Sequence, residues 1–269
     1  STVEVNFNQC IKKLIEYYNT RQYSELILFG EKAALQFPKK AIIKNIIGAG
    51  YTALNQFSNA INHYKAALKL EPKNAEVLNN LGLTYKEIGD LKKANECFEN
   101  SISIKPNFAE AFNNLALSLK EERKFEKAII SLEKAISLKN NYAEAYYNLG
   151  NVYNLLGELE KSINMFTRAI DIKSDYFDAY NNLGAVYNLK KDYDKAYQNI
   201  QKAITLNPNN ADAYNNLGTS ALNLNKEEEA IKHYNKAISI DPKLINAHSN
   251  LCSLFERSNN LRQFEFIIK

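Results

Sequence analysis

The chain has 269 residues, a formal net charge of +4 and only three cysteines. Such a small basic excess argues against a nucleic-acid-binding protein, which concentrates positive charge on one face. An odd number of widely spaced cysteines argues against a disulfide framework or a zinc site, and indicates free thiols in a reducing, cytoplasmic compartment. No apolar run reaches about 18 residues, so no segment is expected to span a membrane.

A glycine or another small residue recurs every 34 residues, and a fixed period of this length predicts a stack of similar supersecondary units around one continuous core. The column consists of Gly48, Gly82, Ala116, Gly150, Gly184, Gly218 and Cys252. We therefore expect a single solenoid over residues 1–269. Its units are 7–40, 41–74, 75–108, 109–142, 143–176, 177–210, 211–244 and a partial 245–269.

The first unit, 7–40, departs from the pattern of the others. Leu14 stands in the glycine column, and Gly30 stands where later units carry a large residue. Terminal repeats are usually atypical because one of their faces has no neighbour. We expect this unit to be a degenerate cap.

The spacing of apolar residues predicts two helices in each unit between residues 41 and 244. In unit 177–210, Tyr180, Leu183, Gly184 and Tyr187 have the spacing of an apolar helix face, and a second run begins at Tyr193. Small residues are expected to let the paired helices approach closely, while larger ones fill the gaps. The large residues are Tyr64, Phe98, Leu132, Phe166, Ile200 and Tyr234.

The eighth unit, 245–269, is expected to stop partway through its second helix. Its residues Leu261, Phe264, Phe266 and Ile267 would form an apolar edge, so we expect the chain to be a segment of a longer protein. Cys97 and Cys252 fall on apolar columns, and we expect both side chains to be buried.

These columns closely resemble the tetratricopeptide repeat family. One unit carries the whole motif in Asn182, Leu183, Gly184, Tyr187, Ala196, Ala203 and Pro208, although Asn140 and Ser174 replace the proline elsewhere. The resemblance implies an all-α, right-handed superhelical solenoid of helix–turn–helix repeats, in which the first helices line a concave groove. The carboxylate clamp of some relatives is not expected, since Lys86 and Lys120 are the main cations on the groove face.

Packing does not explain one column on that groove face. Asparagine occupies it in six consecutive units, at Asn80, Asn114, Asn148, Asn182, Asn216 and Asn250. The preceding position carries Asn79, Asn113, Asn181 and Asn215, and is interrupted by Tyr147 and Ser249. About one residue in seven is asparagine. Even at this frequency, chance would rarely place asparagine at the same position of six successive repeats.

The column has two interpretations. An amide side chain has both donor and acceptor groups, so a ladder of amides can pair with the backbone of an extended peptide, at roughly one rung for every third residue. Tyr147 would be a contact in the middle of that ladder, or would pack inward. Alternatively, the amides satisfy polar groups at the seam between repeats. The column is similar to the asparagine ladder of O-linked N-acetylglucosamine transferases, whose repeats hold substrate polypeptides.

The N-terminal end of the groove face is apolar instead. It carries Ile11, Ile15, Ile42, Ile46, Ala49 and Ala53. These residues predict an anchor pocket for a ligand side chain, or else a surface where the cap packs or two chains associate.

The sequence predicts a protein-interaction module that binds an extended polypeptide. The groove ligands are expected to be the six column residues together with Asn113, Asn181, Asn215 and Tyr147. No catalytic, metal or cofactor motif is found, so this segment is not expected to be an enzyme. It would recruit substrates or partners for a larger protein, a transferase among the candidates. The alternative is a scaffold or weakly self-associating adaptor that uses its convex face or its apolar N-terminal end.

Overall fold

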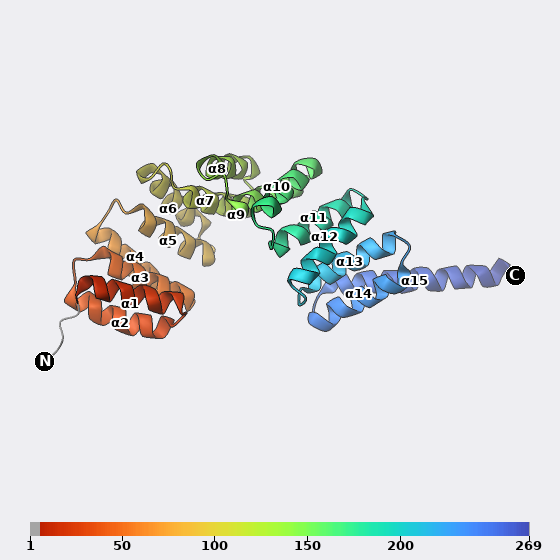
Figure 1. Cartoon of the computed structure of the whole chain (residues 1–269), viewed down its shortest axis with the longest axis horizontal. Helices are drawn as coiled ribbons and strands as arrows, with labels where there is room; N and C mark the ends of the chain where they lie inside the picture. Colours follow the sequence, from red (N-terminus) through yellow and green to blue (C-terminus); the bar gives the residue numbers. More distant parts are fainter. Residues whose placement is uncertain (1–5, 269) are drawn as a thin grey trace. The chain divides into compact units, whose positions relative to one another are not determined.

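The computed structural model describes residues 6–268, with side chains up to residue 257. Within this range the chain forms fifteen α-helices and no β-strand, which confirms the predicted all-α class (Figure 1). None of these described helices is long and apolar enough to cross a membrane. Tertiary contacts divide the chain into two compact units, which we call unit 1 (Ser1–Asn140) and unit 2 (Asn141–Lys269).

Unit 1 contains four helical pairs that stack in chain order. In each pair the first helix packs against the second helix of its own repeat, which then packs against the first helix of the next repeat. The helices are α1 (Phe7–Asn19), α2 (Tyr23–Gln36), α3 (Ala41–Ala53), α4 (Phe57–Leu70), α5 (Ala75–Glu87), α6 (Leu91–Ile104), α7 (Ala109–Glu121) and α8 (Phe125–Leu138).

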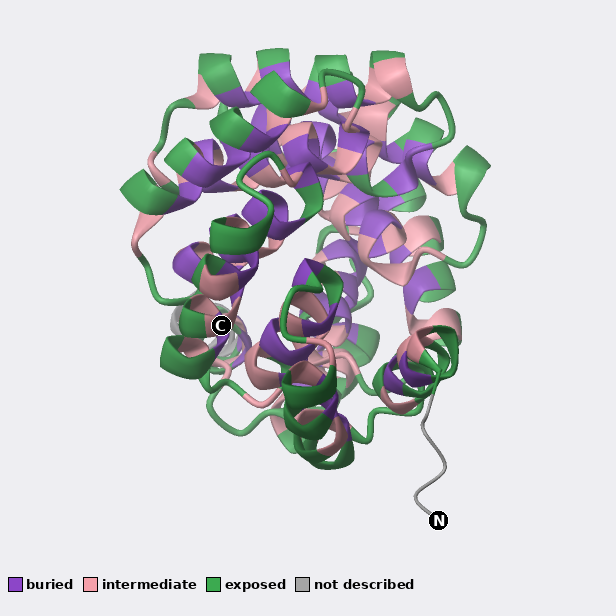
Figure 2. Cartoon of the chain, turned by 90° about the vertical axis from the view of Figure 1, so that its left-hand side faces the viewer, coloured by how far each residue is buried: buried purple, intermediate pink, exposed green. Residues whose placement is uncertain are grey.

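Unit 2 contains three helical pairs built in the same way, followed by one longer helix. The helices are α9 (Ala143–Leu155), α10 (Leu159–Ile172), α11 (Phe177–Leu189), α12 (Tyr193–Leu206), α13 (Ala211–Asn223), α14 (Glu227–Ile240) and α15 (Ile245–Ile268). In both units the buried residues lie on the helix faces that meet other helices, and exposed residues lie at the turns and on the outward faces of the helices (Figure 2).

The turn inside each helical pair places one residue in the left-handed region, with φ between +57° and +77°. These residues are Arg21, Asn55, Gly89, Arg123, Gly157, Lys191 and Asn225, which keep the 34-residue spacing. Only two of them are glycines, although glycine adopts positive φ most readily. The turn is therefore imposed by the packing of the two helices more than by the residue that makes it.

The glycine column packs directly on the column of large residues, as the sequence predicts. A Cβ atom added to Gly82 would lie 2.7 Å from the ring of Phe98, and one added to Gly48 would lie 2.7 Å from the ring of Tyr64. Both rings are almost completely buried. A larger residue at Gly48 or Gly82 would have to displace the ring that it meets.

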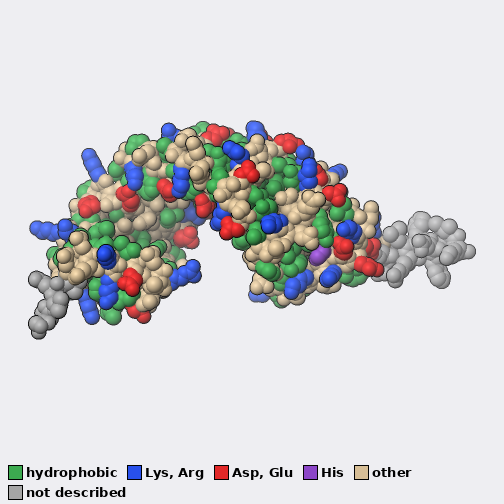
Figure 3. Space-filling model, in the orientation of Figure 1, with side chains coloured by type: hydrophobic (Ala, Val, Ile, Leu, Met, Phe, Trp, Pro, Cys, Tyr) green, Lys and Arg blue, Asp and Glu red, His purple; other side chains and the backbone are tan. Residues whose placement is uncertain are grey.

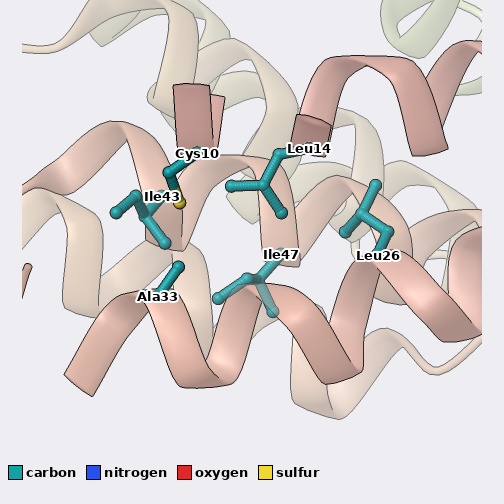
Figure 4. Close-up of a cluster of buried hydrophobic side chains, with 6 residues drawn as sticks. All are labelled: Cys10, Leu14, Leu26, Ala33, Ile43 and Ile47. Atoms are coloured by element: carbon teal, nitrogen blue, oxygen red, sulfur yellow. The ribbon is translucent and has the colours of Figure 1, made fainter. Parts of the chain in front are cut away.

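The degenerate first repeat keeps this packing, but its small and large residues have exchanged columns. Leu14, in the glycine column, is fully buried, and Gly30 stands opposite it in the column of large residues. A Cβ atom added to Gly30 would lie 3.4 Å from Leu14 Cδ2 and 2.6 Å from Ile47 Cγ1. Figure 4 shows Leu14 and Ile47 in the cluster of buried side chains that this exchange fills.

The eighth repeat differs from the prediction. We expected a second helix to begin within this repeat, but α15 continues as one helix from Ile245 to Ile268. The expectation that Cys252 is buried is also wrong, since Cys252 is exposed whereas Cys97 is buried. Cys252 lies in the column that a second helix covers elsewhere. The predicted apolar edge at Leu261, Phe264, Phe266 and Ile267 lies outside the described side chains.

Candidate functional site

The asparagine column makes hydrogen bonds from one repeat to the preceding one. In each case the side-chain Nδ2 donates to the Oδ1 of an asparagine 35 residues earlier. The bonds are Asn80 to Asn45 (3.1 Å), Asn114 to Asn79 (2.9 Å), Asn216 to Asn181 (3.1 Å) and Asn250 to Asn215 (3.0 Å). We call these the seam pairs. They show that the column satisfies polar groups at the seam between repeats, which is the second of the two interpretations given by the sequence.

In three of the four seam pairs the acceptor is the more deeply buried partner, and in the fourth Asn45 is half-buried like its donor Asn80. Asn79 is 7 % exposed, Asn181 is 9 % exposed and Asn215 is 8 % exposed, whereas Asn80, Asn114, Asn216 and Asn250 are half-buried. Removing a donor would leave a buried carbonyl oxygen without a partner, which is destabilising. Asn113 and Asn148 are also buried, and each has an interaction partner.

Sequence reasoning missed Asn45 as a member of the seam. In the second repeat the column itself is occupied by Ile46, so the run of asparagines starts one repeat later. Asn45 nevertheless stands one position before the column, where Asn79 and Asn181 also stand. This shared position was the signal in the sequence that could have identified Asn45 as a seam residue.

Tyr147 replaces an asparagine acceptor at the seam. Its hydroxyl group accepts a hydrogen bond from Asn182 Nδ2 at 3.1 Å. The same Nδ2 also donates to Asn151 Oδ1 at 2.9 Å. The Tyr147 ring packs against Phe166 and Tyr176, with centroids 5.7 Å and 5.0 Å away, and burial raises the pKa of its phenol. Tyr147 therefore packs inward and remains neutral.

Five of the six column amides use only their Nδ2 group within the described part of the chain. Among residues 6–257, the Oδ1 atoms of Asn80, Asn114, Asn182, Asn216 and Asn250 accept no hydrogen bond. The seam bonds hold these amides in place, and each of the five residues is partly exposed. The arrangement offers a row of oriented acceptors in each unit.

The apolar end of the groove face forms a cavity in unit 1. It has a volume of about 400 Å³ and is lined by Ile15, Tyr18, Asn45, Ile46, Ala49, Thr52, Ala53, Tyr64, Asn80 and Leu83. Four of the six apolar residues noted in the sequence contribute to it. Of the other two, Ile11 packs into the N-terminal core and Ile42 is exposed. We call this cavity the N-terminal pocket.

Unit 2 has a more polar groove face. Asn188 Nδ2 donates to the backbone oxygen of Asn216 at 3.2 Å, and Ser220 Oγ donates to Asn188 Oδ1 at 2.9 Å. Together with Asn151, these residues extend the amide network beyond the column itself. The two units thus share the seam but differ in what surrounds it.

Charged groups near the groove face are largely paired within the protein. Lys105 bonds Glu76 at 2.6 Å and thereby lowers the pKa of that carboxyl group, and Lys86 bonds Glu121 at 3.0 Å. On the face shown in Figure 3, basic and acidic side chains are interspersed. The lysine expected to be a main groove cation, Lys86, is therefore neutralised by a neighbour.

Comparison with known proteins agrees with the repeat pattern. The model of the TPR repeat matches residues 48–89, 120–157 and 150–191, and models of the tetratricopeptide repeat match residues 75–108 and 175–243. Together the matches cover more than half of the chain. The chain belongs to the tetratricopeptide repeat family. No curated protein matches it.

Several solved structures share the fold. The chain is similar to one in the APC/C hetero-tetramer Cut9–Hcn1, with a TM-score of 0.77, 18% identity, and coverage of 93% of this chain and 49% of that one. It thus spans about half of that chain's length. It is also similar to pilF of Pseudomonas aeruginosa (TM-score 0.71, 16% identity, 79% and 97% covered).

A third similar structure has a reported ligand site. YrrB is described as a TPR protein with an unusual peptide-binding site. Its TM-score is 0.57 at 19% identity, and the similarity covers 70% of this chain and 96% of YrrB. At such identities the three comparisons establish the helical-repeat fold, and the groove chemistry rests on the residues of this chain.

Proposed function

We propose that this tetratricopeptide repeat protein holds an extended polypeptide along the first-helix face, with the column asparagines accepting hydrogen bonds from the ligand backbone. The observation that carries the proposal is how the amides of Asn80, Asn114, Asn182, Asn216 and Asn250 are used. In these five half-buried residues the seam fixes Nδ2, while Oδ1 accepts no hydrogen bond within residues 6–257. A carbonyl oxygen fixed in this way meets a peptide N–H with little loss of side-chain entropy.

The repeat spacing suits an extended chain. Packed helices lie about 8–10 Å apart, and an extended peptide advances about 3.3 Å per residue, so one acceptor would serve roughly every third ligand residue. Such contacts ignore ligand side chains. YrrB, which shares the fold, is described as having a peptide-binding site, and this supports a ligand of the same kind here.

The expected affinity is modest. Each hydrogen bond contributes about 0.5–1.5 kcal/mol net, and ordering the peptide offsets part of the sum. We infer binding in the micromolar range or weaker from backbone contacts alone. A module of this kind suits the recruitment of substrates or partners for a larger protein. Its similarity to the repeats of O-linked N-acetylglucosamine transferases, at the six column residues, makes a transferase one candidate.

A matched pair of variants separates ligand binding from the seam. Asn216→Ala and Asn181→Ala remove the same seam hydrogen bond, but only the first removes the groove-facing Oδ1 of Asn216. Asn114→Ala and Asn79→Ala form the same pair in unit 1. Binding should be screened on an array of unrelated unstructured peptides.

We expect Asn114→Ala and Asn216→Ala to weaken binding of most peptides several-fold. Their matched controls should lose clearly less, because they release the amide from the seam but keep its Oδ1 as an acceptor. Equal losses within each pair would mean that the seam, and not the acceptor, governs binding. The alternative function, a self-associating adaptor, predicts a sedimentation coefficient that rises with protein concentration and no capture of peptides.

A further inference from the structure

The N-terminal pocket is bounded by helices of three successive repeats in unit 1. Its apolar lining comes from Ile15 and Tyr18 of α1, from Ile46, Ala49 and Ala53 of α3, and from Leu83 of α5. Ala49 and Ala53 are small, whereas Leu83 stands at the position in α5 that corresponds to Ala49. The cavity therefore arises because small residues follow one another along α3.

The inner polar groups of the pocket are already satisfied by the protein. Thr52 Oγ1 lies 3.3 Å from the hydroxyl oxygen of Tyr64 and 3.1 Å from Thr84 Oγ1, at hydrogen-bond distance from each. Burial raises the pKa of Tyr64 to about 12, so its ring remains neutral. The remaining inner surface is mainly apolar.

Two large apolar side chains line this space while remaining exposed. Ile15 is 45% exposed and Tyr18 is 42% exposed. Water in contact with such a concave apolar surface is readily displaced by an apolar group. None of the ten lining residues is charged, so a charged ligand side chain would lose its hydration there without gaining a partner.

An amide pair lies in the same pocket. Asn80 Nδ2 donates to Asn45 Oδ1 at 3.1 Å. Among residues 6–257, the Nδ2 of Asn45 and the Oδ1 of Asn80 have no hydrogen-bond partner, which leaves a donor and an acceptor close together. One peptide unit presents the complementary C=O and N–H groups.

We propose that the N-terminal pocket receives a large uncharged side chain, aromatic or branched aliphatic, from an extended partner polypeptide, while Asn45 and Asn80 hold the adjacent peptide unit. This inference rests on the proposed function and adds a specificity site to it. A helix of a second copy would fill the apolar part alone, since helical peptide groups are already paired. An extended segment uses both parts of the pocket.

The experiment compares two labelled peptides on the full chain. Both are short polar sequences, and they differ only in one central residue, Phe or Ala. Fluorescence anisotropy gives the dissociation constant of each. We expect the Phe peptide to bind about tenfold to a hundredfold more tightly, because burying one such side chain has an effect of that size.

Variants that fill the pocket should remove this preference. Ala49→Leu and Ala53→Phe project a larger side chain into it, and Ala53 starts from an exposed position, which protects the fold. Ala185→Leu makes the change of Ala49→Leu at the corresponding position of unit 2 and serves as the matched control. We expect the filled variants to bind both peptides equally, and Ala185→Leu to retain the preference.

Three outcomes would overturn the inference. The wild type could bind both peptides equally, the filled variants could keep the preference, or the wild type could dimerise in sedimentation while Ala53→Phe does not. The first two leave peptide binding, and hence the proposed function, intact. Failure of both peptides to bind at all would instead remove the proposed function as well.

Discussion

Unit 1 and unit 2 repeat the same seam but surround it with different chemistry. In unit 1 the seam pair of Asn45 and Asn80 borders an apolar pocket, and Lys86 is paired with Glu121. In unit 2 the corresponding face is extended by further amides, Asn151 and Asn188. The seam is therefore common to both units, whereas the neighbouring groove positions differ between them.

The largest effect should come from the core that the two units share. Phe98→Ala in unit 1 and Phe166→Ala in unit 2 remove equivalent, fully buried rings. We expect each to lower the free energy of unfolding by about 3–5 kcal/mol, because each leaves a cavity against its glycine. Urea denaturation followed by circular dichroism measures the loss. Clearly unequal losses would show that the two units are not packed alike.

The seam should give the next largest effect, and it should differ between the units. Asn114→Ala leaves the buried Oδ1 of Asn79 without its donor, so we expect a loss of about 1–3 kcal/mol. Tyr147→Phe removes one acceptor, but Asn182 keeps Asn151, so we expect a loss of about 0.5–1 kcal/mol. The same denaturation assay ranks them. The reverse order would contradict the seam as described.

The reactivity of the cysteines should also differ between the two units. Cys10 and Cys97 of unit 1 are buried, and burial raises the pKa of the Cys97 thiol to about 11, so little thiolate forms at neutral pH. Cys252 of unit 2 is exposed. We expect iodoacetamide to label Cys252 quickly in the folded protein and the other two only after denaturation, as peptide mass spectrometry can show. Rapid labelling of Cys97 would be inconsistent with its burial.

The smallest effect should come from the turns. Arg123 in unit 1 and Lys191 in unit 2 have φ of 61° and 65°. Replacing each by glycine relieves the left-handed strain but adds freedom to the unfolded chain, so we expect a net gain below about 1 kcal/mol. Gly89→Ala is the control and should destabilise. Thermal melting of the variants side by side checks the order.

The repeat pattern was predictable because packing acts within a repeat. Gly82 faces Phe98 across one helical pair, and Leu14 with Gly30 keeps that rule with the sizes exchanged. Spacing along the sequence therefore carries the information. The helix boundaries follow from the same columns and from the turns that separate them.

The seam pairs were less accessible from sequence. An asparagine column is equally compatible with a ligand and with a neighbouring repeat, and the stacking of repeats decides which atom meets which. The hydrogen bond from Asn80 to Asn45 joins residues 35 positions apart in the sequence, one more than the repeat period. The exposure of Cys252 was missed for a related reason, since burial in that column requires a second helix that α15 does not provide.

The most direct test of backbone recognition changes only the ligand backbone. A peptide selected on the array should be compared with the same sequence methylated at backbone nitrogens at every third residue, in each of the three registers. If column Oδ1 atoms accept ligand N–H groups, one register should lose binding about tenfold or more, while the other two lose less. Equal affinity for all four peptides would contradict the account.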